Sequence, residues 1–200
     1  TGCGFLMKLG FKKVYVDKDV VAGSLGGFTY GVTTEEMAGA YATIANDGVY
    51  RRATCVKFIK DLNGKTVADE SVRGTKVYDV NATRMITDMM KTVVTSGTGT
   101  AANISNGIVC GKTGTTNSNK DAWFVGYSKY YTTSVWIGYD MPANINSPGT
   151  YTCGIFKQFM TAVHEGLSVV DFTPYNTETK QQQSTAAETK SAQPETKAEV

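Results

Sequence analysis

The chain has 200 residues and a formal net charge of +2 at pH 7. That length is enough for one domain with a sizeable core. The near-neutral charge, with no basic cluster interleaved with aromatic residues, argues against nucleic acid as a partner. No apolar run approaches the roughly 20 residues that cross a bilayer, so any signal or anchor is expected outside these residues.

Cysteine and histidine usage points away from a metal or redox site. The four cysteines, Cys3, Cys55, Cys110 and Cys153, are widely scattered and form no Cys-x-x-Cys pair. Buried free thiols are expected, although spacing alone leaves a disulfide open. The single histidine, His164, has no second ligand or partner base in view, so a surface or helix-capping position is expected. We therefore expect no metal and no cofactor.

The first predicted helix spans residues 33–46. Thr33 and Glu36 have the spacing of a capping box at its start, and Gly48 follows as its stop. Its apolar residues fall on one face at helical spacing, namely Met37, Ala40, Tyr41 and Ile44.

Two short strands and a second helix follow. Strands are predicted at residues 54–60 and 65–67, joined by an Asn-Gly turn. We expect this hairpin at the periphery of the fold. The helix is predicted from about Ala82 to just before Gly97, with methionines and other apolar residues at the i, i+4 and i+7 spacings. These methionines are interpreted as core packing.

The pattern then changes to strands over residues 107–115, 122–128 and 132–140. Short polar turns join them, which favours antiparallel neighbours in one sheet. A third helix near residues 153–166 can cover one face of that sheet. Helices flanking an antiparallel sheet predict an α+β fold.

The end of the chain differs in composition from the rest. Residues 173–200 lack apolar periodicity and repeat a Glu-Thr-Lys triplet among Gln, Ser, Ala and Pro. Such a composition cannot bury a core, so a disordered low-complexity tail is predicted there. Residues 1–172 are left as the folded portion.

The segment 110–116, CGKTGTT, carries the strongest chemical signal. Gly111-Lys112-Thr113 matches the end of a nucleotide-binding loop, but Gly107 lies one residue too close to complete that motif. A strand, rather than the required helix, is predicted after it. The phosphate-binding hypothesis is therefore disfavoured, and nucleotide titration would test it.

The alternative is an edge strand beside a cleft. In an extended backbone Lys112 and Gly114 point to one face, while Thr113 and Thr115 point to the other, unless a twist or bulge brings them together. The glycine permits close approach of a substrate backbone, and a free strand N–H can stabilise an oxyanion. The alternative without function is an edge strand whose lysine merely discourages aggregation.

Lys112-Thr113-Gly114-Thr115 is similar to the Lys-Thr-Gly motif of the penicillin-recognising serine acyltransferases. Residues 111–117, 121–127 and 135–140, with 31–48 upstream, resemble in order and spacing the transpeptidase domain of class A (bifunctional) penicillin-binding proteins. The resemblance covers roughly Leu9 to Leu167. It implies the α+β fold of penicillin-binding protein transpeptidases and serine β-lactamases, incomplete at its N-terminal side.

The resemblance also implies a function, namely a D,D-transpeptidase that cross-links peptidoglycan. A serine of that family attacks the D-alanyl-D-alanine end of a stem peptide, and β-lactam antibiotics are taken in place of the peptide. The implied location is the extracytoplasmic face of the bacterial cell membrane, with an anchor outside this chain.

The roles implied by the resemblance fall on five positions. Lys112 is expected to supply positive charge and hydrogen bonds, and Thr113 and Thr115 are expected to bind the terminal carboxylate. The backbone N–H of Thr115 is expected to form half of the oxyanion hole, so Lys112 and Thr115 are the expected catalytic residues. Gly114 and Thr116 complete the expected substrate-binding set.

The chain departs from the family by lacking both Ser-x-x-Lys and Ser-x-Asn. Ser24 is followed by Leu-Gly-Gly and Ser118 by Asn-Lys-Asp, and no other serine fits either motif. We expect both motifs in an upstream remainder of the same enzyme, which makes this chain a C-terminal fragment or separately encoded piece, inactive alone. The alternative is a non-catalytic module of the same ancestry that binds cell-wall peptides or proteins.

Overall fold

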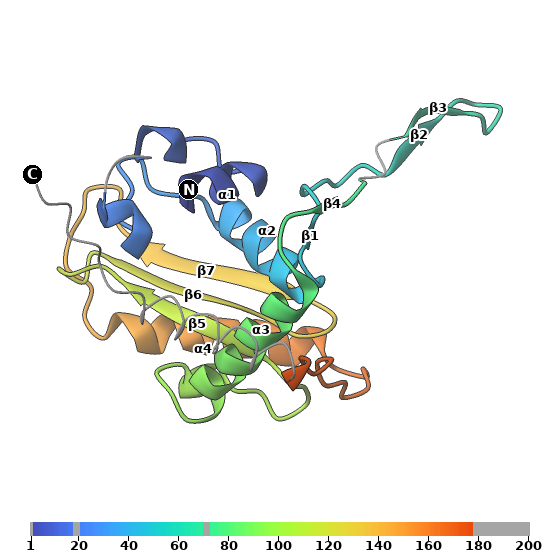
Figure 1. Ribbon diagram of the computed structural model, residues 1–200. Helices are drawn as coiled ribbons and strands as arrows, with labels where there is room; N and C mark the ends of the chain where they lie inside the picture. The colour runs from blue at the N-terminus through green and yellow to red at the C-terminus, as the bar shows by residue number, and fades with distance from the viewer. Residues whose placement is uncertain (1, 18–20, 70–72, 178–200) are drawn as a thin grey trace, which may run out of the picture.

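A three-stranded antiparallel sheet lies at the centre of the computed structural model, which describes residues 2–17, 21–69 and 73–177 (Figure 1). Its order is β5-β6-β7, with β5 at Cys110–Thr115, β6 at Asp121–Tyr127 and β7 at Thr132–Gly138. All three predicted strands are confirmed, although β5 begins at Cys110 rather than at residue 107. The predicted α+β fold with an antiparallel sheet flanked by helices is also confirmed.

Helices cover both faces of this sheet. Phe124 and Tyr127 of β6 point to opposite faces because they lie an odd number of residues apart. Helix α4, Pro148–Val163, packs on the Phe124 face. Helices α2, Thr34–Ala45, and α3, Val80–Thr95, pack on the Tyr127 face. The architecture therefore has three layers.

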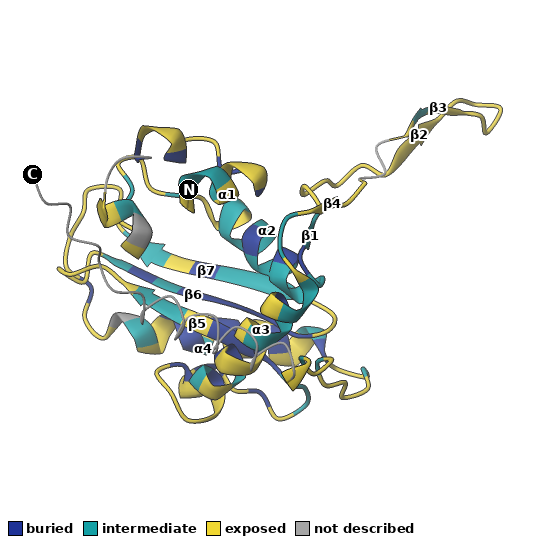
Figure 2. Cartoon of the chain, in the orientation of Figure 1, coloured by how far each residue is buried: buried dark blue, intermediate teal, exposed yellow. Residues whose placement is uncertain are grey.

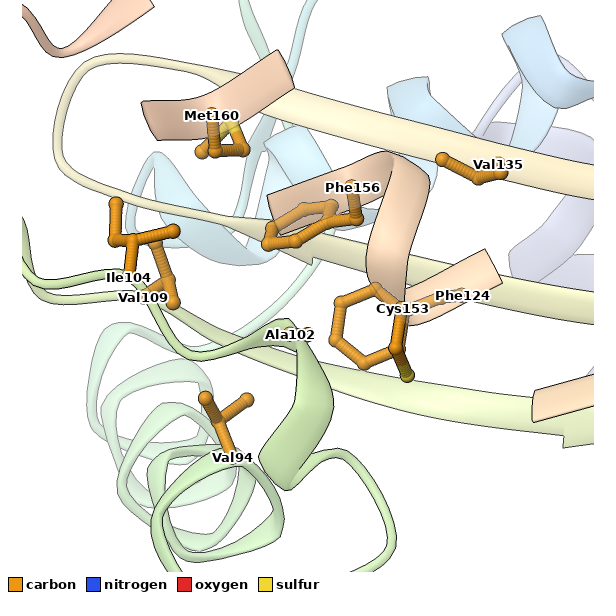
Figure 3. Packing of buried hydrophobic residues seen from close by; sticks show 9 residues of the cluster. All are labelled: Val94, Ala102, Ile104, Val109, Phe124, Val135, Cys153, Phe156 and Met160. Carbon is orange, nitrogen blue, oxygen red and sulfur yellow. The ribbon is translucent and has the colours of Figure 1, made fainter. Parts of the chain in front are cut away.

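The core on the α4 face is built around two aromatic rings. Phe124 and Phe156 meet edge to face with ring centroids 4.6 Å apart, and both are fully buried. Gly126 lies beside them, and a Cβ there would approach Phe156 Cζ to 3.0 Å. Figure 3 shows the cluster, which comprises Val94, Ala102, Ile104, Val109, Phe124, Val135, Cys153, Phe156 and Met160.

The core on the other face centres on Tyr127. Its hydroxyl lies 2.7 Å from the Thr87 hydroxyl of α3, and its ring meets Phe172 edge to face. Cys110 packs against the same ring, and burial raises the pKa of its thiol to about 12. Cys110 is the first residue of β5 and is fully buried, so its thiol is a packing group rather than a nucleophile. All four cysteines are free, and Cys110 and Cys153 are buried as predicted. The predicted burial is wrong for Cys3, which is half-buried, and for Cys55, which is exposed.

Capping residues set the helix boundaries. The capping box at the start of α2 is confirmed, because Thr33 Oγ1 accepts from the Glu36 N–H and the Glu36 carboxylate accepts from the Thr33 N–H. Helix α3 begins at Val80, before the predicted Ala82, because the Asp79 carboxylate caps its first turn. Helix α4 starts at Pro148 rather than Cys153, since proline suits a first helical turn.

His164 caps the end of α4 as predicted, but it is buried, so the predicted surface position is wrong. Its Nδ1 lies 2.7 Å from the Met160 carbonyl oxygen, and its Nε2 lies 2.8 Å from Ser128 Oγ. Ser128 Oγ also accepts hydrogen bonds from the backbone N–H groups of Tyr130 and Tyr131. The histidine therefore ties the last turn of α4 to the β6–β7 turn.

Several short elements lie outside the central sheet and its three long helices. Helix α1 at Gly2–Lys8 and two 3₁₀ turns, η1 at Val14–Asp17 and η2 at Val21–Leu25, lack a long apolar period and were not predicted. Leu9, Phe11 and Val14 pack with Ala40 of α2 in a core of their own. Further elements are β1 at Val49–Tyr50, paired with β4 at Thr75–Lys76, and η3 at Thr100–Ala102.

The predicted hairpin forms strands β2, Phe58–Lys60, and β3, Thr66–Asp69. It projects away from the rest of the chain (Figure 1), and most of its residues are exposed (Figure 2). Gly64 closes its turn at φ +80°. The peripheral position expected for this hairpin is confirmed.

The C-terminal described residues lie against α3. Lys91 Nζ donates to Asp171 Oδ1 at 2.8 Å, and Asn81 Nδ2 donates to the Asn176 carbonyl oxygen at 3.1 Å. Most of the predicted tail at 173–200 lies outside the described residues, which end at 177. Among the residues described, no helix combines the length and apolarity needed to span a membrane.

The edge-to-face pair on the α4 face generates a stability prediction. Replacing fully buried Phe156 with alanine removes its packing on Phe124, and we expect a loss of about 3–5 kcal/mol in the free energy of unfolding. The matched control is Phe159→Ala on the same helix, where the side chain is 50% exposed. Urea unfolding followed by circular dichroism measures both, and equal losses would contradict this packing account.

A bidentate ion pair generates a pH prediction. Arg84 of α3 donates from Nε and Nη2 to the two carboxylate oxygens of Asp47, both at 2.9 Å. The hydrogen bonds from Arg84 lower the pKa of Asp47 in the folded state. Stabilisation from a lowered carboxyl pKa is present above the unfolded value near 3.9 and disappears as pH falls through the folded value.

Asp47→Asn keeps a residue tolerant of the left-handed backbone at φ 51° but removes the charge. We expect a lower melting temperature than wild type at pH 7 and a difference that shrinks below about pH 4. Thermal unfolding across this pH range measures the difference. A gap that widens on acidification would show that the ion pair is not its cause.

Candidate active-site strand

The residues predicted for the site lie along one edge of the central sheet. Among the described strands β5 pairs with β6 alone, so its other side is an unpaired edge. Lys112 and Thr115 are exposed, Thr113 and Gly114 are half-buried, and Thr116 follows directly after the strand. The structure therefore keeps all five positions together and open to solvent.

The pairing with β6 determines which backbone groups are free. Thr116 N donates to Asp121 O at 3.2 Å, so this opposed pair is hydrogen-bonded across the ladder. Hydrogen-bonded and non-hydrogen-bonded pairs alternate in an antiparallel ladder. The next pair, Thr115 opposite Ala122, is therefore a non-hydrogen-bonded pair, and so is Thr113 opposite Phe124. The N–H groups of Thr113 and Thr115 point out from the free edge.

The lysine reaches the same edge by an unexpected route. Strict alternation places Lys112 and Thr113 on opposite faces, and the β5–β6 register is regular, with no bulge between them. The Lys112 side chain instead curls around the edge, so that Nζ lies 2.9 Å from the Thr113 carbonyl oxygen and 3.4 Å from Thr113 Oγ1. Side-chain length, rather than a bulge, brings the ammonium to the hydroxyl.

A second hydroxyl joins this group. Thr98 Oγ1 lies 2.9 Å from Thr113 Oγ1, although the two residues are 15 positions apart. The sequence indicated only that the helix ends near Gly97, and Thr98 was not predicted as part of the site. The only local signal is its place between two glycines just after a helix, and nothing in that pattern points to Thr113.

Gly114 lies opposite Trp123 of β6 in the sheet. A Cβ at this position would lie 3.2 Å from Trp123 Cβ, which is tighter than an ordinary contact. Trp123 stands opposite Trp136 of β7, with ring centroids 6.3 Å apart, and Trp136 Nε1 donates to Asp121 Oδ1 at 3.1 Å. Because Gly114 has no side chain, the strand backbone between Lys112 and the two tryptophans is not covered by a side chain at this position.

The turn after β5 is held from two sides. Thr116 Oγ1 accepts from the backbone N–H groups of Lys120 and Asp121, both at 3.0 Å. The loop before α4 reaches across, with Ile145 N donating to Asn119 O at 2.8 Å. Thr116 therefore anchors the turn, while its hydroxyl proton stays available as a donor.

The serine–histidine pair elsewhere in the fold is not a second catalytic centre. Ser128 and His164 are 4% and 2% exposed, and Ser128 Oγ already accepts two backbone N–H groups. A buried oxygen that is occupied in this way has no path to a substrate. The pair joins two structural elements, as its position at the end of α4 indicates.

The nucleotide-binding alternative does not fit the backbone. Phosphate-binding loops lead into a helix whose N-terminus holds the anion. Here Gly111-Lys112-Thr113 lies within β5, and a turn and then β6 follow. The segment is an antiparallel edge strand, as the alternative to a phosphate-binding loop predicted.

Comparison with known proteins matches residues 8–161 to the family described as the penicillin binding protein transpeptidase domain. Penicillin-binding protein 4 of Bacillus subtilis is 39% identical over 131 residues, which are 65% of this chain and 21% of that protein. Penicillin-binding protein 1A of Clostridium acetobutylicum is 30% identical over 172 residues, 86% of this chain and 21% of its own length. The chain thus spans about a fifth of these curated relatives.

Solved structures agree in fold. The PonA1 protein from Mycobacterium tuberculosis in complex with penicillin V aligns with a TM-score of 0.64 at 28% identity, over 72% of this chain and 42% of that chain. Penicillin-binding protein 1A from Haemophilus influenzae aligns with a TM-score of 0.65 at 20% identity, which supports the fold alone, over 86% of this chain and 32% of that one. The chain belongs to the penicillin-binding protein transpeptidase family, with class A penicillin-binding proteins among its homologues.

Proposed function

We propose that this chain is the substrate-binding distal part of a serine D,D-transpeptidase that cross-links peptidoglycan stem peptides and is acylated by β-lactams. The observation that carries the proposal is the free edge of β5, which holds the outward N–H groups of Thr113 and Thr115, the hydroxyls of the same two residues and the Lys112 ammonium. Beside these donors, the same edge presents the outward carbonyl groups of Thr113 and Thr115, so it can pair with a peptide backbone and also bind a negative charge. A peptide that ends in a carboxylate complements it.

In this proposal a stem peptide extends along β5 and adds to the sheet edge through backbone hydrogen bonds. Its terminal carboxylate accepts from the Thr113 and Thr115 hydroxyls, with the Lys112 ammonium beside them. The scissile carbonyl then lies over Gly114, and the Thr115 N–H stabilises its developing oxyanion. Loss of one such donor typically costs about 3 kcal/mol of transition-state stabilisation.

The attacking serine belongs, in the same proposal, to a part of the polypeptide outside these 200 residues. The chain has neither Ser-x-x-Lys nor Ser-x-Asn, and it spans only about a fifth of its curated relatives. The serine hydroxyl forms an ester with the penultimate D-alanine, free D-alanine leaves with a proton, and an amine of a neighbouring stem displaces the serine. An extracytoplasmic location, with the anchor in that other part, follows from this chemistry.

The first test uses a fluorescent penicillin on the longer polypeptide that contains this sequence and on the 200-residue chain. We expect covalent labelling of the longer polypeptide, prevented by prior treatment with unlabelled penicillin, and none of the chain alone, because only the former carries the serine. Gel fluorescence after denaturation measures the bond. A folded longer polypeptide that takes no label would favour the non-catalytic cell-wall binding module.

The second test removes one hydroxyl from the free edge. Thr113→Val in the longer polypeptide should lower the second-order rate constant of penicillin acylation about tenfold or more, because a hydrogen bond to the carboxylate is lost. Thr132→Val in β7 is the matched control and should leave this rate constant near wild type. If both variants acylate at the wild-type rate, the Thr113 hydroxyl does not bind the carboxylate.

A further inference from the structure

The contact between Thr98 and Thr113 has no part in the function proposed so far. Thr98 lies in the loop between α3 and η3, and its Oγ1 is 2.9 Å from Thr113 Oγ1. Thr98 is exposed, so core packing does not account for the contact. It is a polar contact from outside the strand to one of the predicted ligand-binding groups.

The loop that carries Thr98 is tightly fixed. Gly97 N and Gly99 N both donate to the Val93 carbonyl oxygen, at 3.2 and 3.0 Å. A Cβ at Gly97 would approach Val93 Cα to 2.8 Å, and a Cβ at Gly99 would approach Phe124 Cε2 to 3.0 Å. Glycine on both sides therefore lets the loop fold onto the end of α3 and onto the core. The Thr98 side chain extends from a backbone held in place.

Hydroxyl chemistry assigns a direction to the contact when a carboxylate binds. A carboxylate only accepts hydrogen bonds, so Thr113 must turn its single O–H proton toward the ligand. The hydrogen bond between the two threonines then requires Thr98 to donate and Thr113 to accept. Lys112 Nζ, which only donates, lies 3.4 Å from the same Thr113 oxygen. Thr98 and Lys112 thus both donate toward Thr113 Oγ1, which leaves the hydroxyl proton of Thr113 free to donate to the ligand.

We propose that Thr98 is a positioning residue that orients the Thr113 hydroxyl for the carboxylate of the stem peptide or β-lactam. This inference rests on the proposed function of the β5 edge. Thr98 acts through Thr113 and does not itself touch the ligand. Without Thr98, the Thr113 hydroxyl can rotate away from the donor orientation, and binding then has to restore that orientation.

The main test is a double-mutant cycle in the longer polypeptide, read as the second-order rate constant of acylation by fluorescent penicillin. Thr98→Val should lower this constant about fivefold, which corresponds to one neutral hydrogen bond. Thr98→Ser, which keeps the hydroxyl, should restore it. In a Thr113→Val background, Thr98→Val should cause no further loss, because its partner is already absent.

Three results of that cycle would overturn the proposal: no loss with Thr98→Val, an undiminished loss in the Thr113→Val background, or no rescue with Thr98→Ser. A contact that only stabilises the loop would give a different result. Thr98→Val would then lower the melting temperature, and its loss of acylation rate would be as large in the Thr113→Val background as in the wild type.

A binding measurement separates failure of this inference from failure of the proposed catalysis. Two ligands are titrated by nuclear magnetic resonance: N-acetylated D-alanyl-D-alanine with a free carboxylate, and the same peptide with an amide at its C-terminus. Their dissociation constants are compared for the wild-type longer polypeptide and its Thr98→Val and Thr98→Ser variants. If penicillin does not acylate the protein but Thr98→Val still reduces the preference for the free carboxylate about fivefold, and Thr98→Ser restores it, the role of Thr98 stands. Equal carboxylate preference in all three proteins overturns it.

Discussion

The hydrogen-bond register between β5 and β6 is the constraint on which the candidate site depends. Thr115 stands opposite Ala122, and this pairing sends the N–H groups of Thr113 and Thr115 away from the sheet. A slip of one residue would reverse every side chain and would exchange free and bonded amides. Lys112 would then leave its present face, and Thr115 could no longer donate at the edge. One register therefore sets the electrostatic character of the whole edge.

The fold secures that register by burying both faces of β6. Phe124 is packed against Phe156 on one face, while Tyr127 is packed and hydrogen-bonded to Thr87 on the other. A slipped strand would bring each ring into a core shaped for the other. The turn that links β5 to β6 is fixed in addition by the Thr116 hydroxyl, which accepts two backbone N–H groups. Packing far from the edge thus determines which groups the edge presents.

Local patterns in the sequence predicted the parts of the structure that local physics controls. The three strands and the Thr33 capping box were predictable, and so was the place of Lys112 to Thr115 on one strand, because neighbours along a strand or helical turn remain neighbours in space. The burial of His164 was not, because it arises where α4 meets a turn 36 residues away along the chain. Thr98 was missed for the same reason. The path of the Lys112 side chain was missed because alternation predicts only the face on which a side chain starts.

Residue-resolved amide hydrogen exchange over β5 measures which of its N–H groups are bonded to β6. We expect an alternating pattern in the 200-residue chain, with slow exchange at Lys112 and Gly114, whose N–H groups bond to β6, and fast exchange at Thr113 and Thr115. Slow exchange at Thr113 and Thr115 with fast exchange at Gly114, or uniform protection along the strand, would contradict it. Either result would mean that the edge does not offer the donors that a peptide carboxylate and an oxyanion require.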